Sequence, residues 1–155
     1  MKRRGLNILI VMIISVISFQ SCEQDDENEN ETKISTYNST ESHMEGQNCM
    51  NCHESGGSGE GWFTTAGTVY DSSKKSTFPN ATVKLFTGPN GTGDLKLTIQ
   101  VDNYGNFYTT ENLDYGDGIY TSVEGNSVTK HMNSSITSGQ CNSCHGINTD
   151  PIWTE

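Results

Sequence analysis

Basic residues are scarce in this chain. Nine Lys and Arg stand against nineteen Asp and Glu in 155 residues, which gives a formal net charge of −10 at pH 7. Beyond Arg4 the sequence holds no arginine. Such a chain repels nucleic acid, which is therefore not an expected partner, and a basic partner protein suits it better. The same charge also serves simply to keep a protein soluble.

Long apolar runs are also rare. An uninterrupted run extends from Ile8 to Ile14, continues with breaks to Phe19, and follows the basic residues Lys2, Arg3 and Arg4. This run is the length of a signal-peptide apolar region and falls short of the ~20 residues that a spanning helix needs. The sequence therefore predicts a signal peptide over residues 1–21 and export from the cytoplasm.

A single cysteine follows this segment. The sequence Phe19-Gln20-Ser21-Cys22 resembles the cleavage box of bacterial lipoproteins, although Phe19 and Gln20 depart from its usual aliphatic and small residues. The resemblance implies a lipid anchor on Cys22, and it accounts for the one cysteine of five that the motifs below leave unpaired.

Residues 22–45 are acidic and polar, and we expect them to form a lipidated, disordered tether. The cluster at residues 23–27 resembles the acidic surface-export signal of lipoproteins in the Bacteroidetes group of bacteria. That resemblance implies an outer membrane lipoprotein facing outward, with the periplasmic face as the alternative. A merely solvated spacer is the simpler interpretation of the cluster.

One five-residue pattern, Cys-x-x-Cys-His, occurs twice, at residues 49–53 and 141–145. It is typical of covalent c-type haem attachment, because two thiols three positions apart can form thioethers with the two vinyl groups of one porphyrin while the His binds the iron. The predicted haem-binding residues are Cys49, Cys52, His53, Cys141, Cys144 and His145, with His53 and His145 as the proximal iron ligands. Residues 46–62 and 131–155 are the two expected haem-binding segments.

Structural zinc or disulfide pairing is the alternative for these cysteines. The two motifs lie much farther apart in sequence than the halves of a zinc ribbon, which closes over about 15–20 residues. We therefore expect two covalently bound c-type haems.

A His-Met pair precedes each motif, His43-Met44 before the first and His131-Met132 before the second. Either residue of a pair can reach over its haem as the second iron ligand. The chain has four histidines in total, which two haems with His on both sides would use completely. His43 and His131 are therefore the favoured distal ligands, Met44 and Met132 are the rivals, and an open or swapped site is also left.

Between the motifs the chain reads as short alternating strands bounded by turn sequences, without amphipathic helices. The expected strands cover residues 65–70, 81–86, 95–101, 105–110, 119–124 and 127–130. This spacing predicts a mainly β fold, an antiparallel β-sandwich over residues 63–130 flanked by short irregular or helical haem-binding segments. An even number of strands returns the chain to the end at which it entered, so we expect the two haems to be neighbours.

Three turn-and-core signals, at residues 67–71, 79–83 and 101–107, resemble the carboxypeptidase regulatory-like (prealbumin-like) domain family. The resemblance covers roughly residues 63–130 and implies the fold but no activity. The turn at residues 102–106 has calcium-type oxygen ligands. Leu113 stands where a calcium-binding hand needs a bidentate Glu, so a structural turn is expected there.

The motifs together resemble small multihaem cytochromes c. That resemblance implies a dihaem electron carrier at the cell envelope, with redox proteins or an extracellular acceptor as partners and the membrane reached through the lipid. An enzyme is not expected, because no Arg after Arg4 and no spare His are left for acid–base chemistry. The alternative function is a surface binding or adhesion module, and self-association becomes attractive only if the haems lie at opposite ends.

Overall fold

The computed structural model describes residues 30–155. The expected signal peptide, the lipid-bearing Cys22 and the acidic cluster at residues 23–27 all lie outside the described residues. Within residues 30–155 no helix is both long enough and apolar enough to span a bilayer.

The described chain consists mainly of short strands. They are β1 (Thr65–Tyr70), β2 (Thr82–Phe86), β3 (Leu95–Gln100), β4 (Asn106–Thr109), β5 (Tyr120–Glu124), β6 (Thr129–His131), β7 (Gly139–Gln140) and β8 (Ile152–Trp153). The helical elements of residues 30–155 are three single 3-10 turns, η1 (Cys49–Asn51), η2 (Pro89–Gly91) and η3 (Cys141–Ser143).

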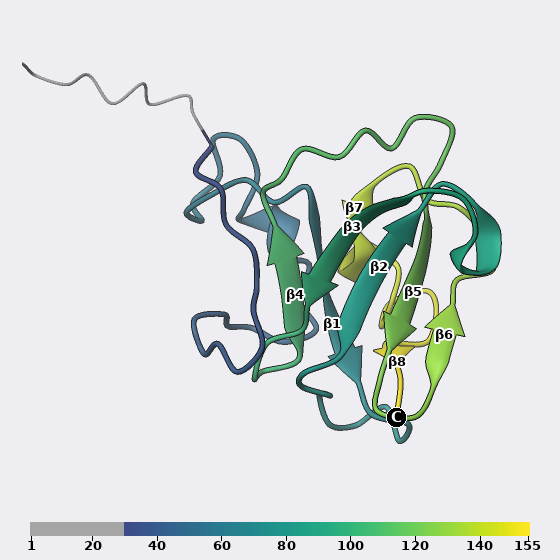
Figure 1. The fold of residues 1–155 in the computed structure, drawn as a ribbon. Coiled ribbons are helices and arrows are strands. Elements are labelled where there is room, and N and C mark those ends of the chain that lie inside the picture. The colour runs from purple at the N-terminus through teal and green to yellow at the C-terminus, as the bar shows by residue number, and fades with distance from the viewer. Residues whose placement is uncertain (1–29) are drawn as a thin grey trace, which may run out of the picture.

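The strands form two sheets (Figure 1). The first has the order β4-β1-β7, and β8 also pairs with β1 farther along that strand. The second has the order β3-β2-β5-β6 and is antiparallel throughout. In the first sheet β4 runs antiparallel to β1, whereas β7 and β8 run parallel to it.

A single apolar core joins the two sheets. Val69 of β1 and Phe107 of β4 meet side chains of the second sheet, among them Leu85 and Ile99, and all four are essentially inaccessible to solvent. Along β2 buried residues alternate with half-buried ones, as expected of a strand with one face on a core. The expectation of a mainly β sandwich is confirmed.

Five of the six expected strands lie where the sequence pattern placed them, and the sixth is shifted to Thr129–His131. The segment expected to be irregular, residues 131–155, instead contributes β7 and β8 to the first sheet. Each of these strands is two residues long. Two residues are too few for an alternating pattern to appear in a sequence.

The expectation of a disordered tether up to residue 45 is wrong for residues 30–45. Ile34 forms a bridge with Thr109, and Ser35 is 1% exposed and donates its N–H to the Tyr108 carbonyl over 2.9 Å. The Ser35 hydroxyl also donates to the Gln100 carbonyl over 2.6 Å. This segment runs beside β4 in Figure 1. Backbone pairing and a small buried hydroxyl hold it, and neither leaves the apolar signal by which order is recognised in a sequence.

The turn at residues 102–106 has a structural role, as expected. One carboxylate oxygen of Asp102 accepts the backbone N–H groups of Tyr104 and Asn106, both over 2.9 Å. Gly105 follows with φ at +82°, a conformation that glycine adopts without steric cost. Asp102 is fully buried, and its other carboxylate oxygen has no hydrogen-bond partner in the described residues.

Candidate functional site

The two Cys-x-x-Cys-His motifs fold into the same local structure. In each, a 3-10 turn begins at the first cysteine, and the backbone N–H of the second cysteine donates to the carbonyl of the first over 3.2 Å. The His N–H donates to the same carbonyl over 3.0 Å in both motifs. The second cysteine has φ −114° and ψ −37° in the first motif and φ −115° and ψ −48° in the second. Both motifs therefore present two thiols and one imidazole in the same way.

Both motif histidines are held through the same ring nitrogen. His53 Nδ1 lies 3.0 Å from the Glu60 carbonyl oxygen, and His145 Nδ1 lies 2.7 Å from the Asp150 carbonyl oxygen. A carbonyl oxygen only accepts, so Nδ1 carries the hydrogen in each ring, which leaves Nε2 as the nitrogen with the lone pair in the neutral imidazole. A metal-binding histidine is commonly oriented by such a hydrogen bond from its other nitrogen. No sequence pattern indicates these two carbonyl groups.

The four motif cysteines are free thiols in this structure. No three His, Cys, Asp or Glu side chains among residues 30–155 gather into a metal-binding cluster. The zinc alternative needs the cysteines to converge, and the disulfide alternative needs them to pair. The described residues show neither arrangement.

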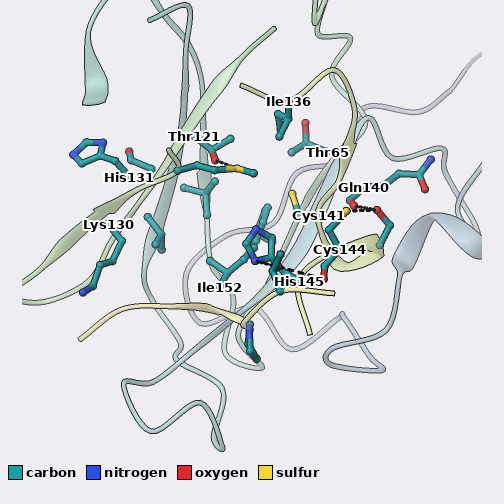
Figure 2. A pocket seen from close by; sticks show the side chains of 18 of the residues that line it. Thr65, Thr121, Lys130, His131, Ile136, Gln140, Cys141, Cys144, His145 and Ile152 are labelled. Carbon is teal, nitrogen blue, oxygen red and sulfur yellow. Dashed lines mark hydrogen bonds between the residues drawn. The ribbon is translucent and has the colours of Figure 1, made fainter. Parts of the chain in front are cut away.

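Each motif lines its own cavity. The first-motif cavity, of about 680 Å³, contains Cys49, Cys52 and His53 together with the first His-Met pair. The second-motif cavity, of about 690 Å³, contains Cys141, Cys144 and His145, the second His-Met pair and apolar residues of both sheets (Figure 2). Cavities of roughly 300–1,000 Å³ are typical of cofactor sites. The structure thus brings each predicted set of haem ligands into a single cavity.

In the first-motif cavity the rings of the two histidines lie close together. The ring centroids of His43 and His53 are 5.8 Å apart, with the rings tilted by 37°. Two metal–nitrogen bonds of about 2 Å each account for most of such a separation. The His53 ring also stacks on Phe63, with centroids 4.2 Å apart and the planes within 9°. Met44 is 64% exposed.

In the second-motif cavity the two candidate distal ligands, His131 and Met132, point in different directions. The Thr121 hydroxyl donates to Met132 Sδ over 3.5 Å, as the dashed line at Thr121 in Figure 2 marks. His131 also borders the cavity, but Figure 2 shows its ring directed away from His145. A Cβ atom built on Gly91 would come within 3.4 Å of His131 Cε1, so the imidazole lies against the η2 turn.

The two motif segments touch each other. Asn142, 3% exposed, donates its amide to the Gln47 carbonyl over 2.9 Å, and Asn48 donates to the Gln140 side chain over 3.3 Å. The two motif segments are therefore neighbours, whereas the expectation that the two haems are neighbours stays a prediction. The chain path to this contact differs from the expected one. The expectation rested on an even number of antiparallel strands, whereas in the structure the pairing of β7 with β1 brings the second motif back.

Thr68 in β1 is the buried hub of this contact. Its hydroxyl donates to Asn106 Oδ1 over 2.7 Å and accepts the Gly46 N–H and an Asn142 amide hydrogen, each over 2.9 Å. Its own N–H donates to Asn142 Oδ1 over 3.1 Å. Buried polar groups satisfied in this way fix one arrangement of the segments they join.

Packing and charge differ between the two motifs. A Cβ atom on Gly67 of β1 would lie 2.9 Å from Cys141 Cβ and 2.6 Å from Phe107 Cζ, so only glycine lets the second motif dock there. Burial raises the pKa of the Cys141 thiol to about 12 and raises the pKa of the Cys49 thiol as well. The Asp102 carboxylate adds to the rise at Cys49, which places a buried negative charge near the first motif.

Comparison of the chain with protein-family models, with curated proteins and with solved structures finds no match. The prealbumin-like and cytochrome resemblances therefore stay predictions. What the site can do follows from its own geometry, which is two equivalent motifs, two cavities and one shared polar contact.

Proposed function

We propose that this protein is a dihaem c-type cytochrome that carries electrons at the cell envelope. Each haem, when bound, supplies one-electron oxidation and reduction at its iron. The chain contributes the attachment, the iron ligands, the enclosure and the relative placement of the two groups. This makes it an electron carrier and not an enzyme.

The residues have distinct tasks in this proposal. The four motif cysteines hold the two porphyrins through thioether bonds, and His53 and His145 bind the irons through Nε2. The carbonyl groups of Glu60 and Asp150 keep each imidazole in that orientation. Apolar walls, which include Phe63 in one cavity and Phe107 in the other, keep water from the metal.

The single observation that carries the proposal is the repetition of one local geometry. Two motifs separated by a whole sandwich adopt the same turn, bond the same ring nitrogen to a backbone carbonyl, and each open onto a cavity large enough for a cofactor. Two disulfides do not require the imidazoles to be held with Nε2 free, and a zinc site would need the thiols and imidazoles to converge, which they do not do among residues 30–155.

The test is expression of the chain in a bacterium that has haem-maturation machinery. The expected product carries two haems by mass spectrometry and shows a Soret band with a sharp α band on reduction. Changing Cys49 and Cys52 to Ala removes one haem, and changing Cys141 and Cys144 removes the other. A colourless product of unmodified mass contradicts the proposal and favours the binding-module alternative.

A further inference from the structure

The sequence offers the same choice of distal ligand, His or Met, before each motif, but the structure treats the two pairs differently. In the first pair the centroid of the histidine ring lies 5.8 Å from that of the motif histidine, and the methionine is 64% exposed. Met44 has φ +55°, in a turn closed by the Gln47 N–H, which donates to the Met44 carbonyl. This left-handed backbone turns the Met44 side chain in a direction different from that of His43.

In the second pair, the register between β5 and β6 decides which of the two side chains faces the cavity. Lys130 of β6 stands opposite Val123 of β5, whose side chain belongs to the core, and His131 stands opposite Ser122. Neighbouring residues of a strand point to opposite faces, so His131 points to the outer face of the second sheet. Met132, two positions after Lys130, returns to the inner face, where Thr121 holds its sulfur.

Lys130 also points to the inner face, but its ammonium group already contacts another side chain. The Lys130 ammonium lies 3.7 Å from the centroid of the Trp153 ring, in a cation–π contact. Of the second His-Met pair, this leaves the thioether of Met132, whose sulfur accepts the Thr121 hydroxyl, as the donor on the inner wall of the cavity that His145 also lines.

A buried acidic residue distinguishes the first motif from the second. The fully buried Asp102, one of whose carboxylate oxygens has no hydrogen-bond partner among residues 30–155, lies near the first motif. The lining charges are mixed in both cavities: Glu41, Glu60 and Lys33 line the first, where Lys33 pairs with Glu60 over 3.0 Å, and Lys130 and Asp150 line the second. Negative charge near an iron favours its oxidised state, and positive charge favours its reduced state.

Building on the proposed function, we propose that the two haems are unlike. His43 and His53 ligate the first, and Met132 and His145 ligate the second. Thioether ligation raises a haem's reduction potential, and the buried Asp102 near the first motif would lower that of the first haem. The first haem is then the low-potential entry site and the second the high-potential exit, so an electron passes from the iron held by His53 to the iron held by His145. That transfer oxidises the first iron by one electron and reduces the second by one.

The decisive experiment compares Met132→Leu with Met44→Leu in the two-haem protein. Leu has nearly the volume of Met and cannot bind iron, so folding is preserved. The oxidised parent should show a weak Met–iron absorption band near the red end of the visible range. Met132→Leu should lose that band while keeping two haems by mass, and Met44→Leu should keep it.

A redox titration gives the second readout. The parent should titrate in two separate one-electron steps, and Met132→Leu should move only the upper step to lower potential. His43→Leu should instead disturb the lower step. His131→Leu, which removes the imidazole on the outer face, should leave both steps in place.

Four results would overturn the inference. They are a two-haem parent without the Met–iron band, a band that survives Met132→Leu, a band that disappears in Met44→Leu, and a lower step that moves with His131→Leu and not with His43→Leu. In all four the protein still carries two haems, so the proposed function stands. A parent without haem overturns both.

Discussion

Tyr115 is a residue whose ionisation opposes the fold. Its hydroxyl lies 2.8 Å from the Thr65 hydroxyl and donates to the Thr64 carbonyl over 3.1 Å, and burial raises its pKa from 10.0 to about 12. The folded chain therefore holds this proton more tightly than the unfolded chain. The resulting stability is fully present below pH 10 and is lost as the pH rises toward 12.

Tyr115→Phe should lower the free energy of unfolding at neutral pH by about 1 kcal/mol, because its hydrogen bonds are lost. It should also make the fall in stability above pH 10 shallower. Some decline should remain, because burial also raises the pKa of Tyr108. Urea unfolding at a series of pH values measures both effects, with Tyr104→Phe, at a residue 38% exposed, as the control. An unchanged alkaline slope in Tyr115→Phe would contradict this assignment.

Gly67 tests how closely the second motif approaches β1. In Gly67→Ala the new methyl group would meet Cys141 and Phe107 at less than 3.0 Å. We expect a loss of about 1–3 kcal/mol from overpacking, and a lower yield of the second haem than of the first. Mass spectrometry of the two haem peptides gives the ratio.

Gly125→Ala is the matched control for that substitution. It forces a comparable clash, 2.5 Å to the Glu155 carbonyl oxygen and 2.6 Å to Thr154 Oγ1, and neither contact belongs to a motif. It should destabilise the fold and leave the haem ratio near one. Equal loss of both haems in Gly67→Ala would mean that the glycine serves general stability only.

Among the elements, the two motif turns show that a position which the Cys-x-x-Cys-His pattern leaves open can be buried and hold the turn in place. The residue after the first cysteine is buried in both turns, as Met50 at 7% and Asn142 at 3% exposed. The following residue of the second turn, Ser143, is more open to solvent. One turn therefore anchors itself in apolar contacts and the other in the Thr68 polar hub.

Asn142→Ala should loosen the contact between the motif segments. It leaves the buried Thr68 N–H and the Gln47 carbonyl without their partner, at a cost of about 1–3 kcal/mol. Thermal unfolding measures this cost. The redox titration should also show a weaker dependence of each haem on the state of the other. Ser143→Ala, one position along the same turn, should change neither quantity by a comparable amount, and equal effects of the two substitutions would rule out the hub.

The elements also show which parts of the fold a sequence can reveal. The five long strands carry alternating patterns, and turn residues bound them, so their positions could be predicted. β7 and β8 are too short for any period, and the order of residues 30–45 rests on backbone pairing and on Ser35, which composition does not report. Motif spacing predicts which residues hold the haems, and these assignments stay predictions. The choice between His131 and Met132 depends on the β5–β6 register, which only a structure supplies.

At the scale of the whole molecule, the proposal includes a lipid anchor on Cys22, which lies outside the described residues. Cys22→Ala should release the protein from washed membranes into the soluble fraction, because acyl chains supply most of the binding of such a protein. Immunoblotting of the two fractions measures the release, and Cys49→Ala, which keeps the anchor, should stay with the membrane. Retention of Cys22→Ala would mean that the apolar segment or a partner holds the chain.

The parallel return of β7 and β8 to β1 sets an order of events in assembly. One edge of β1 is completed only by residues 139–153, which emerge last from a chain made or exported from its N-terminus. Once they dock, Cys141 packs against the core, and Cys144 stays exposed on the cavity wall. Under the proposed function, the walls of the second cavity that Cys141 and Ile152 form are in place only at that stage, so we expect porphyrin attachment at the first motif to be possible earlier in assembly than attachment at the second.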